Sequence, residues 1–409
     1  MRSNPETRGG TVLAETVQEL YRAGQADYFL EPIVLMDEIG KPVGRIENGD
    51  SVIFCCRRGE REIQLTEAFT DPGFEHFPRP DLQDLIFVIL TLYHEKFMNL
   101  PVPFAPEKIS ETLGEIVSQA GLRQMRAAES EKFAHVTIFL NGGKNQPFDG
   151  EHDIYIPSPK GVPFDEVPEL SLAEVSQEVQ KGIDQHYDLI VTNFANGDVI
   201  GHTENCAAKV ECARITDRHL GEVVEKALAE EYVVIVTADH GNLEVMLNPD
   251  GSPHVAHTTN LVPFLLKDPR LTSPLNLNDG KLADIAPTIL SALGIEQPAL
   301  MDGVPLVPES PWHEPRRVLL VILDGWGLGP QDDTNPIFLA DTPVFDEMMK
   351  AYGKSYLQAS GEAVGLKKGK AGNSEAGHSN IGAGRVILQD DVRLDLAMKD
   401  GSFYTNEVF

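Results

Sequence analysis

The chain has 409 residues, of which 42% are hydrophobic and 24% charged, a composition typical of a globular protein with two or three domains and a large core. Asp and Glu total 63 against 34 Lys and Arg, so the formal net charge is -29. Such a surface repels nucleic acid and anionic membranes, and neither is an expected partner.

The N-terminus shows no apolar signal region, and no apolar run approaches the length of a membrane span. The cysteines are spaced neither as a zinc knuckle nor as a C-x-x-C redox pair; they are Cys55, Cys56, Cys206 and Cys212. We interpret them as reduced thiols that lie mostly in the core, and we expect a cytoplasmic protein.

The first part of the chain predicts a helix at 11–24 and short strands at 32–36 and 51–55. A basic cluster that includes Arg58 and Arg61 directly follows the second strand. Guanidinium groups offer forked donors that suit a carboxylate or a phosphate. An exposed helix end with surface ion pairs is the alternative explanation of this cluster.

The middle of the chain predicts an α/β fold with a mostly parallel sheet covered on both faces. Near-continuous apolar runs at 85–93 and 134–140 are typical of buried parallel strands, with an amphipathic helix starting near Ser110 between them. Helices and strands then alternate: we expect helices at 171–183 and 206–230, and strands at 188–194, 232–237 and 262–266. The proline-rich stretch 296–315 resembles a linker, and another buried strand after it ends in Asp324.

Polar residues that can bind metals follow three of these strands, and Asp324 is the one at the end of the last strand. Asp198 and His202 are four positions apart and share one face of a helical turn, and Asp239 and His240 precede the flexible Gly241. The carboxyl ends of parallel strands meet at one edge of an open sheet, where ligands bind. Taken alone, an Asp and a His four positions apart more often form a surface ion pair than a pair of metal ligands, and an isolated His-Thr-Thr stretch is usually a turn.

Two further histidines precede the strand at 262–266. His257 is a candidate metal ligand, whereas His254 fits no ligand pattern and is interpreted as an ordinary surface residue. Taken together, three aspartates and three histidines at strand ends favour a site for two ions, and mixed imidazole and carboxylate ligands suit Zn²⁺ or Mn²⁺.

Ser374 is the candidate nucleophile. It lies in the glycine-rich stretch K-A-G-N-S-E-A-G-H-S-N-I-G-A-G-R and precedes a plausible helix. Glycines let the backbone approach a ligand closely, and the start of a helix can present a hydroxyl to a phosphate or a metal. Two ions can bind a phosphoryl oxygen and lower the pKa of such a serine.

Several long strings of this chain resemble the cofactor-independent (2,3-bisphosphoglycerate-independent) phosphoglycerate mutases, which are members of the alkaline phosphatase superfamily. The resemblance covers nearly the whole chain, and it is carried by V-L-L-V-I-L-D-G-W-G, G-E-A-V-G-L, G-N-S-E-A-G-H-S-N-I-G-A-G-R, N-F-A-N-G-D-V-I-G-H, T-A-D-H-G-N, A-H-T-T-N, L-G-E-I-V-S-Q and L-R-Q-M-R-A-A-E-S-E-K-F-A-H-V-T. It implies an alkaline phosphatase-like α/β core with a second, partial transferase domain.

The resemblance also implies a role for each matching position. Ser374 matches the serine that takes the phosphoryl group, and Lys132 matches a lysine that contacts it. One metal ion would be held by Asp198, His202 and His257, the second by Asp324, Asp239, His240 and Ser374, and the substrate by Arg58 and Arg61. The implied cofactors are two divalent ions, Mn²⁺ first with Zn²⁺, Co²⁺ or Mg²⁺ as alternatives, and 2,3-bisphosphoglycerate is not needed.

The order of the segments departs from the family, whose members begin with the aspartate strand and the serine loop, continue into an inserted transferase domain and then supply the other metal ligands. In this chain the segment with those other metal ligands comes first, and the aspartate strand and the serine loop come last. This arrangement resembles a circular permutation at the natural termini. The stretches S-D-G-G-V-H-S-H, D-G-R-D-T-P and G-R-Y-Y-A-M-D-R of the transferase domain have no counterpart, and C-C-R-R-G-E-R replaces F-N-F-R-P-D-R. The predicted domains are the transferase end (1–106), the first core segment (107–300), a linker (301–315), the second core segment (316–388) and the transferase start (389–409).

Three hypotheses follow. The first is a monomeric mutase that interconverts 3-phosphoglycerate and 2-phosphoglycerate through a phosphoserine. The second is a metal-dependent phosphatase that has lost the transfer step. The third is an inactive fragment, or one part of a split enzyme whose second chain supplies the missing transferase segment.

Overall fold

The computed structural model describes residues 9–25, 30–55 and 60–409, with the side chains of residues 9, 60 and 61 outside the description. The chain divides into two compact units, one of residues 1–105 with 405–409 and the other of residues 106–404. None of the described helices is long and apolar enough to cross a membrane.

The larger unit is built on an eight-stranded sheet with the order β4-β3-β5-β9-β6-β7-β10-β8. Its first five strands in that order are parallel, and β7 runs antiparallel to both of its neighbours. The strands are β3 (Gln124–Glu129), β4 (Glu151–Ile156), β5 (Leu189–Phe194), β6 (Val233–Thr237), β7 (Val262–Lys267), β8 (Gly280–Lys281), β9 (Val318–Leu323) and β10 (Gly353–Gln358). The expected mostly parallel α/β sheet is therefore confirmed.

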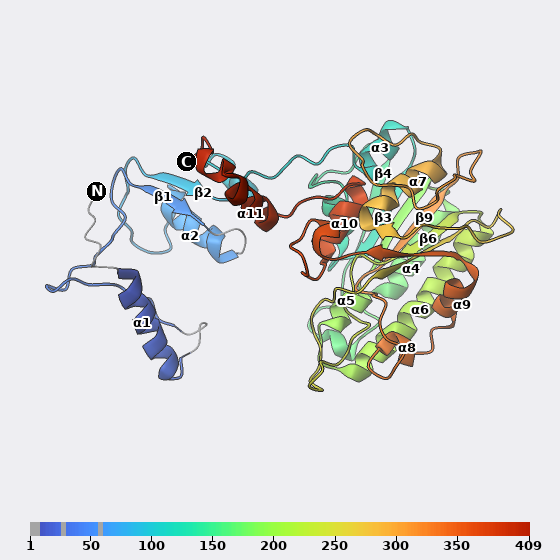
Figure 1. The fold of residues 1–409 in the computed structure, drawn as a ribbon, viewed down its shortest axis with the longest axis horizontal. Helices are drawn as coiled ribbons and strands as arrows, with labels where there is room; N and C mark the ends of the chain where they lie inside the picture. Colours follow the sequence, from blue (N-terminus) through green and yellow to red (C-terminus); the bar gives the residue numbers. More distant parts are fainter. Residues whose placement is uncertain (1–8, 26–29, 56–59) are drawn as a thin grey trace. The chain divides into compact units, whose positions relative to one another are not determined.

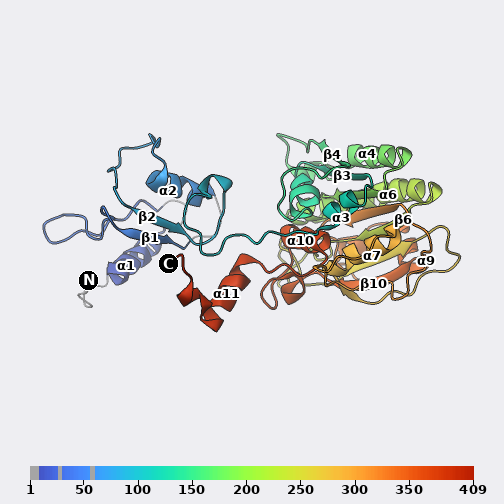
Figure 2. The ribbon, with the colours of Figure 1, turned by 90° about the horizontal axis from the view of Figure 1, so that it is seen from above.

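Helices cover both faces of this sheet (Figure 1). Helices α4 (Leu172–Asp184) and α6 (Cys206–Ala229) pack on one face, and α3 (Leu113–Gln119), α7 (Ile285–Leu293) and α10 (Ser374–Ala383) on the other, as the view from above also shows (Figure 2). With both faces covered, β5, β6 and β9 are buried along their whole length, which explains their continuous apolar sequences. The remaining helices of this unit are α5 (Asn196–Gly201), α8 (Pro336–Leu339), α9 (Pro343–Ala351), α11 (Asp390–Asp400), the π-helix η3 (His135–Phe139) and the 3₁₀ turns η4 (Phe164–Glu166), η5 (Leu282–Asp284), η6 (Gly361–Val364) and η7 (Ser402–Thr405).

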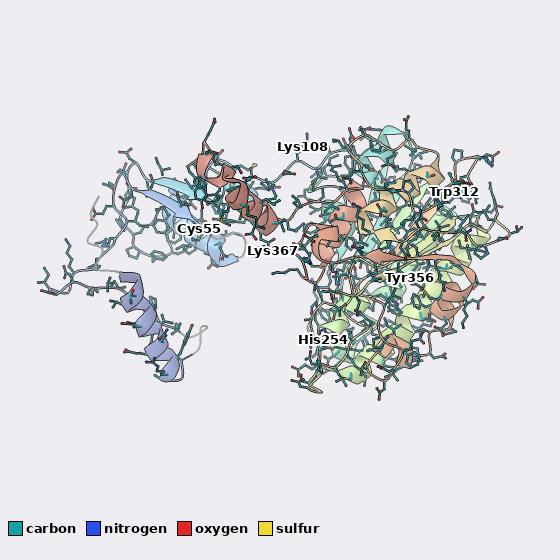
Figure 3. The ribbon with its side chains drawn as sticks, in the orientation of Figure 1. Cys55, Lys108, His254, Trp312, Tyr356 and Lys367 are labelled. Carbon is teal, nitrogen blue, oxygen red and sulfur yellow. The ribbon has the colours of Figure 1, made fainter. Side chains whose placement is uncertain are left out.

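Strand β9 comes late in the sequence but pairs with two strands from the earlier part of the chain. It follows the proline-rich stretch, yet it lies between β5 and β6, with Leu189 and Val233 both opposite Val318. The proline-rich stretch itself packs on this unit: Met301, Leu306 and Val307 are buried, and the Trp312 indole (Figure 3) donates a hydrogen bond of 3.0 Å to Asp268.

The smaller unit contains α1 (Gly9–Arg22), α2 (Glu60–Thr70), η2 (Glu95–Phe97) and two parallel strands, β1 (Ser51–Phe54) and β2 (Ile86–Ile89). Its buried residues are Phe87, Ile89 and Phe97, with Phe54 and Phe69 among the side chains packed around them. The helix expected at 11–24 and the strand expected at 51–55 are confirmed here.

Three expectations are wrong. The segment expected as a strand at 134–140 instead contains the π-helix η3 (His135–Phe139), because a short apolar run suits a buried helix as well as a buried strand. The strand of this region is β3, which comes before η3 in the sequence. Its buried polar residues Gln124, Arg126 and Glu129 interrupt the apolar run by which a buried strand is recognised. Residues 32–36 make a single bridge, Met36 to Pro42, and no strand.

The cysteines are the third case. Cys212 alone is buried among those described, whereas Cys55 is exposed and Cys206 half-buried, and all three are free thiols. The cysteine side chain is small, so a surface helix or strand can carry it without burying it. Its apolar character alone therefore does not predict whether a cysteine lies in the core.

Candidate metal centre around Ser374

Ser374 is the first residue of α10. The preceding Asn373 is extended, and its side-chain oxygen accepts a hydrogen bond of 2.9 Å from the Ala376 amide, which caps the helix. The cap fixes the start of α10 at Ser374, so the hydroxyl lies at the positive end of the helix.

Glycines bring α10 close to the loop after β6. A Cβ atom on Gly377 would lie 2.7 Å from the carbonyl oxygen of Asp239, and one on Gly372 would lie 3.0 Å from the Cβ atom of His240. At these two positions the absence of a side chain lets α10 and the loop before it pack closely against the loop of Asp239 and His240.

Three polar side chains converge on the Ser374 hydroxyl oxygen. Lys132 Nζ donates to it at 2.6 Å, the hydroxyl donates to Asp324 Oδ1 at 3.2 Å, and His240 Nε2 lies 3.0 Å away. Lys132 also donates to Asp198 Oδ2 at 2.6 Å and to Asp324 Oδ1 at 2.9 Å. A buried ammonium thus links the hydroxyl to two strand-end carboxylates.

The first candidate metal group surrounds Asp198. His202, which ends α5, places Nε2 3.2 Å from Asp198 Oδ1, and His257 Nε2 is 3.0 Å from the same oxygen. Each ring donates its Nδ1 proton to a carbonyl oxygen at 2.8 Å, of Val255 for His202 and of Gly372 for His257. In the neutral tautomers both Nε2 lone pairs therefore face Asp198, as metal ligands require.

The second candidate group is fully buried. His240 Nε2 lies 3.4 Å from Asp324 Oδ1 and 3.6 Å from Asp239 Oδ2, and the latter oxygen has no hydrogen-bond partner among the described residues. The same oxygen lies 3.3 Å from His378 Nδ1, whose proton is donated to the Ser374 carbonyl, so it keeps an unfilled acceptor that a bound cation would satisfy. Ligand atoms close enough to share one ion come from two sets, Asp198 with His240 and His257, and Asp239 with His240 and Asp324.

The charges also favour bound cations. Asp198, Asp239 and Asp324 are buried together, and the Lys132 ammonium contacts two of them, Asp198 and Asp324. Burial would raise the pKa of Asp324, but the Lys132 ammonium holds that pKa far below its ordinary value. Burial likewise opposes charge on His240, but Asp239 and the neighbouring carboxylates raise its pKa to about 9. The donor set and its surplus of negative charge fit two divalent ions.

Four polar residues of the site escaped the analysis of the sequence. Asn193 Nδ2 donates to Asp324 Oδ2 at 2.6 Å and lies 3.1 Å from His378 Nε2, while His378 Nδ1 donates to the Ser374 carbonyl at 2.9 Å. Asn193 is the second-last residue of β5, and His378 lies one helical turn after Ser374; these two positions were the signals that the sequence offered.

The other two secure the loop after β6. Asn242 Nδ2 donates to Asp198 Oδ1 at 2.9 Å. The Glu244 carboxylate accepts from the backbone amides of Asn242 at 2.8 Å and Gly327 at 3.1 Å and from the Thr258 hydroxyl. Glu244 therefore ties the loop of His240 to the loops after β9 and before β7.

Not every predicted site residue can be placed. Arg58 lies outside the described residues, and the side chain of Arg61, in α2, is outside the description as well. His254, interpreted as a surface residue, is half-buried, and its burial lowers its pKa.

Comparison with known proteins supplies the context of this geometry. A model of the metalloenzyme superfamily matches residues 17–297 and 316–403. The chain is 44% identical over 295 residues to the 2,3-bisphosphoglycerate-independent phosphoglycerate mutase of Moorella thermoacetica, covering 72% of this chain and 57% of the relative. It is 45% identical over 293 residues to the enzyme of the same name from Salinibacter ruber, covering 70% and 55%. The chain thus spans a little more than half the length of these relatives.

A solved structure points the same way. Leishmania mexicana phosphoglycerate mutase, determined at low cobalt concentration, is 28% identical in sequence and superposes with a TM-score of 0.52, over 66% of this chain and 53% of that one.

Proposed function

This chain belongs to the metalloenzyme superfamily, and on that premise we propose that it is a phosphoglycerate mutase that interconverts 3-phosphoglycerate and 2-phosphoglycerate through a phosphoserine at Ser374. The observation that carries the proposal is the convergence of Lys132 Nζ, His240 Nε2 and Asp324 Oδ1 within 3.2 Å of the Ser374 hydroxyl oxygen. A serine in this setting is activated for attack on phosphorus.

We assign the metal ligands by their grouping. Asp198, His202 and His257 would hold one ion, because both imidazole Nε2 atoms lie within 3.2 Å of Asp198 Oδ1. Asp239, His240, Asp324 and Ser374 would hold the other, with His240 also within reach of the first, and Mn²⁺ is the proposed metal. Bound there, the two ions would supply Lewis-acid polarisation of the phosphoryl oxygens and a lower pKa for the serine hydroxyl.

The residues of the chain account for the transfer itself. The Ser374 oxygen loses its proton and forms a bond to phosphorus while the bond from phosphorus to the 3-oxygen of glycerate breaks, and that oxygen takes up a proton to become a hydroxyl. The 2-hydroxyl of the same glycerate then loses its proton and forms a bond to phosphorus, while the bond from phosphorus to the Ser374 oxygen breaks and the serine regains a proton. The Ser374 hydroxyl proton points to Asp324 Oδ1, since Lys132 can only donate. The Lys132 ammonium stabilises negative charge on the serine oxygen both when it attacks and when it leaves.

The rest of the proposal concerns substrate, cell and assembly. Arg58 and Arg61 would bind the glycerate carboxylate and phosphate, because guanidinium groups match both anions. No 2,3-bisphosphoglycerate would be needed. The protein would act in the cytoplasm, which suits the free thiols of its described cysteines, and as a monomer unless a second chain supplies further transferase segments. A circularly permuted order stays a prediction.

A metal-dependent phosphatase is the second candidate, and one observation favours it. The matched part of the chain covers 57% and 55% of the length of the two relatives, and a protein that acted with this part alone would have fewer residues to hold glycerate and exclude water. If water replaced the glycerate hydroxyl, the phosphoserine would release phosphate.

A single assay separates these functions. Purified protein with Mn²⁺ and 3-phosphoglycerate, without 2,3-bisphosphoglycerate, is followed for 2-phosphoglycerate and free phosphate together. We expect 2-phosphoglycerate to accumulate. Release of phosphate alone would establish the phosphatase, and the lack of both products would show that this chain alone is an inactive part of a larger or split enzyme.

A further inference from the structure

Lys209 is a buried lysine outside the groups that surround Ser374. It lies in the first turn of α6, it has no exposed surface, and burial lowers the pKa of its ammonium group. Among the described residues its ammonium nitrogen has one hydrogen-bond partner, the carbonyl oxygen of His254. Burial of an ammonium group that has no carboxylate partner costs several kcal/mol of desolvation free energy, on the order given for other buried ions. The hydrogen bond to the His254 carbonyl is therefore not explained by a gain in the stability of the fold.

The carbonyl that Lys209 holds belongs to the segment His254–His257, which organises the first metal group. The next carbonyl along, of Val255, accepts the Nδ1 proton of His202 at 2.8 Å. The segment ends at His257, whose Nδ1 donates to Gly372 at 2.8 Å, two residues before Ser374. The position of these four residues therefore sets the direction of two imidazole rings.

The segment has little else to hold it in place. The side chains of Val255 and Ala256 are exposed, and the loop is bridged at Leu247 and Pro253 on one side and at Gly241 and Thr258 on the other. The His254 amide donates to Met246 at 2.9 Å. Between that bond and His257, Lys209 is the side chain that ties this backbone to the rigid helix α6.

We propose that Lys209 is a positioning residue for the first metal group: its bond to the His254 carbonyl fixes the segment His254–His257 and thereby aims His202 and His257 at Asp198. The inference rests on the proposed two-metal site. Groups that orient metal ligands in this way typically change metal affinity by roughly 10-fold to 100-fold when removed. The second group takes none of its proposed ligands from this segment, although the His240 ring stacks on the His257 ring with centroids 4.1 Å apart. Because its own ligands stay in place, it should keep its affinity.

The test is a titration of metal-free protein with Mn²⁺, read by calorimetry and by the electron paramagnetic resonance of free Mn²⁺. Lys209→Met should weaken one of two ions about 10-fold to 100-fold and leave the other unchanged. Lys209→Met should thus bind the same number of Mn²⁺ ions with high affinity as His257→Ala does. Lys209→Arg keeps a hydrogen-bond donor and should restore part of the affinity that Lys209→Met loses. Lys226→Met is the matched control, because Lys226 lies on the same helix and pairs with Asp184 at 2.5 Å on the surface.

The outcomes are distinct. Wild-type affinity for both ions in Lys209→Met would overturn the inference, even if the melting temperature fell. If that variant does not fold, Lys209→Leu, which also removes the donor but has a smaller side chain, decides by the same titration: wild-type affinity at both sites again overturns the inference, and one weakened ion supports it. A wild-type protein that binds no pair of ions would instead refute the proposed two-metal function.

Discussion

The Nδ1 atom of His257 lies 2.8 Å from the carbonyl oxygen of Gly372, so a candidate metal ligand before β7 is hydrogen-bonded to the loop that carries the candidate nucleophile. Residues far apart in the sequence are thereby fixed together before any substrate is present. Preorganisation of this kind is what two-metal phosphoryl transfer requires. It also means that small changes in the backbone around Ser374 should be felt at the metal ligands.

Replacement of the nucleophile should separate catalysis from folding. Ser374→Ala removes one oxygen atom and should abolish both the phosphoserine and turnover, while the fold and the Mn²⁺-dependent rise in melting temperature persist. Mass spectrometry of protein quenched during turnover, with circular dichroism, checks both. Ser379→Ala on the same helix should behave as wild type. Retained transfer in Ser374→Ala would refute the assignment.

Loss of the Lys132 ammonium should destabilise the metal-free protein. Lys132→Met leaves Asp198 and Asp324 buried without their partner, which should cost about 3–5 kcal/mol in the free energy of unfolding. Urea denaturation with EDTA measures this cost, and added Mn²⁺ should reduce it by replacing the missing charge. Lys181→Met removes an exposed ion pair and should stay within about 0.5 kcal/mol of wild type. Equal stability of the two variants would contradict the prediction.

A methyl group on Gly377 should disturb the second metal group. Its Cβ atom would lie 2.7 Å from the Asp239 carbonyl oxygen and 2.8 Å from the Asp239 Cβ atom, so helix and loop must separate. We expect Gly377→Ala to lose about 1–3 kcal/mol of stability and to bind Mn²⁺ more weakly. Gly10→Ala, where the methyl group meets only open space, is the control. Thermal melts and Mn²⁺ titrations that do not distinguish the two variants would count against this packing.

Glu129 should make stability depend on pH. Burial raises the pKa of this carboxyl from 4.5 to about 7, against hydrogen bonds from Ser158 and Ser171 that lower it. The folded chain therefore keeps a proton that the unfolded chain loses above pH 4.5. Stability from this group is full below that pH and declines as the pH rises to about 7, by on the order of 3 kcal/mol.

Glu129→Gln mimics the protonated side chain and should remove this decline. Its advantage over wild type in urea denaturation should grow between pH 5 and pH 7 and then level off, on the roughly 3 kcal/mol scale of the same linkage. The exposed Glu131→Gln should show no such growth. Parallel pH profiles for wild type and Glu129→Gln would be the contrary result.

The sequence predicted the sheet well where strands are uniformly apolar. Val318–Leu323 and Leu189–Phe194 are buried on both faces, and such strands need continuous hydrophobic residues. It failed at Gln124–Glu129, where burial is compatible with polar side chains because their partners come from distant parts of the chain. The arginine of that strand, for example, donates to the neighbouring Gln124 and lies beside Glu151 and Asp153.

The candidate site was predictable for the same topological reason. Asp198, Asp239 and Asp324 each follow a strand of the parallel part of the sheet, so the fold alone brings them to one edge. Asn193 and His378 were missed, because a position near the end of a strand or one helical turn after a candidate nucleophile is a weak signal without a second residue of the same pattern. Their importance lies in hydrogen bonds that only the folded chain reveals.

The place of β9 between β5 and β6 has a consequence for how the chain folds during synthesis. Leu189 and Val233 must both leave the ribosome and wait until Val318 emerges before the centre of the sheet can close. Pairings of such long sequence separation pay their loop-closure entropy before they gain any contact, which slows folding. The open apolar edges of β5 and β6 are exposed during this delay, so the nascent chain should depend on chaperones more than its finished, strongly acidic surface suggests.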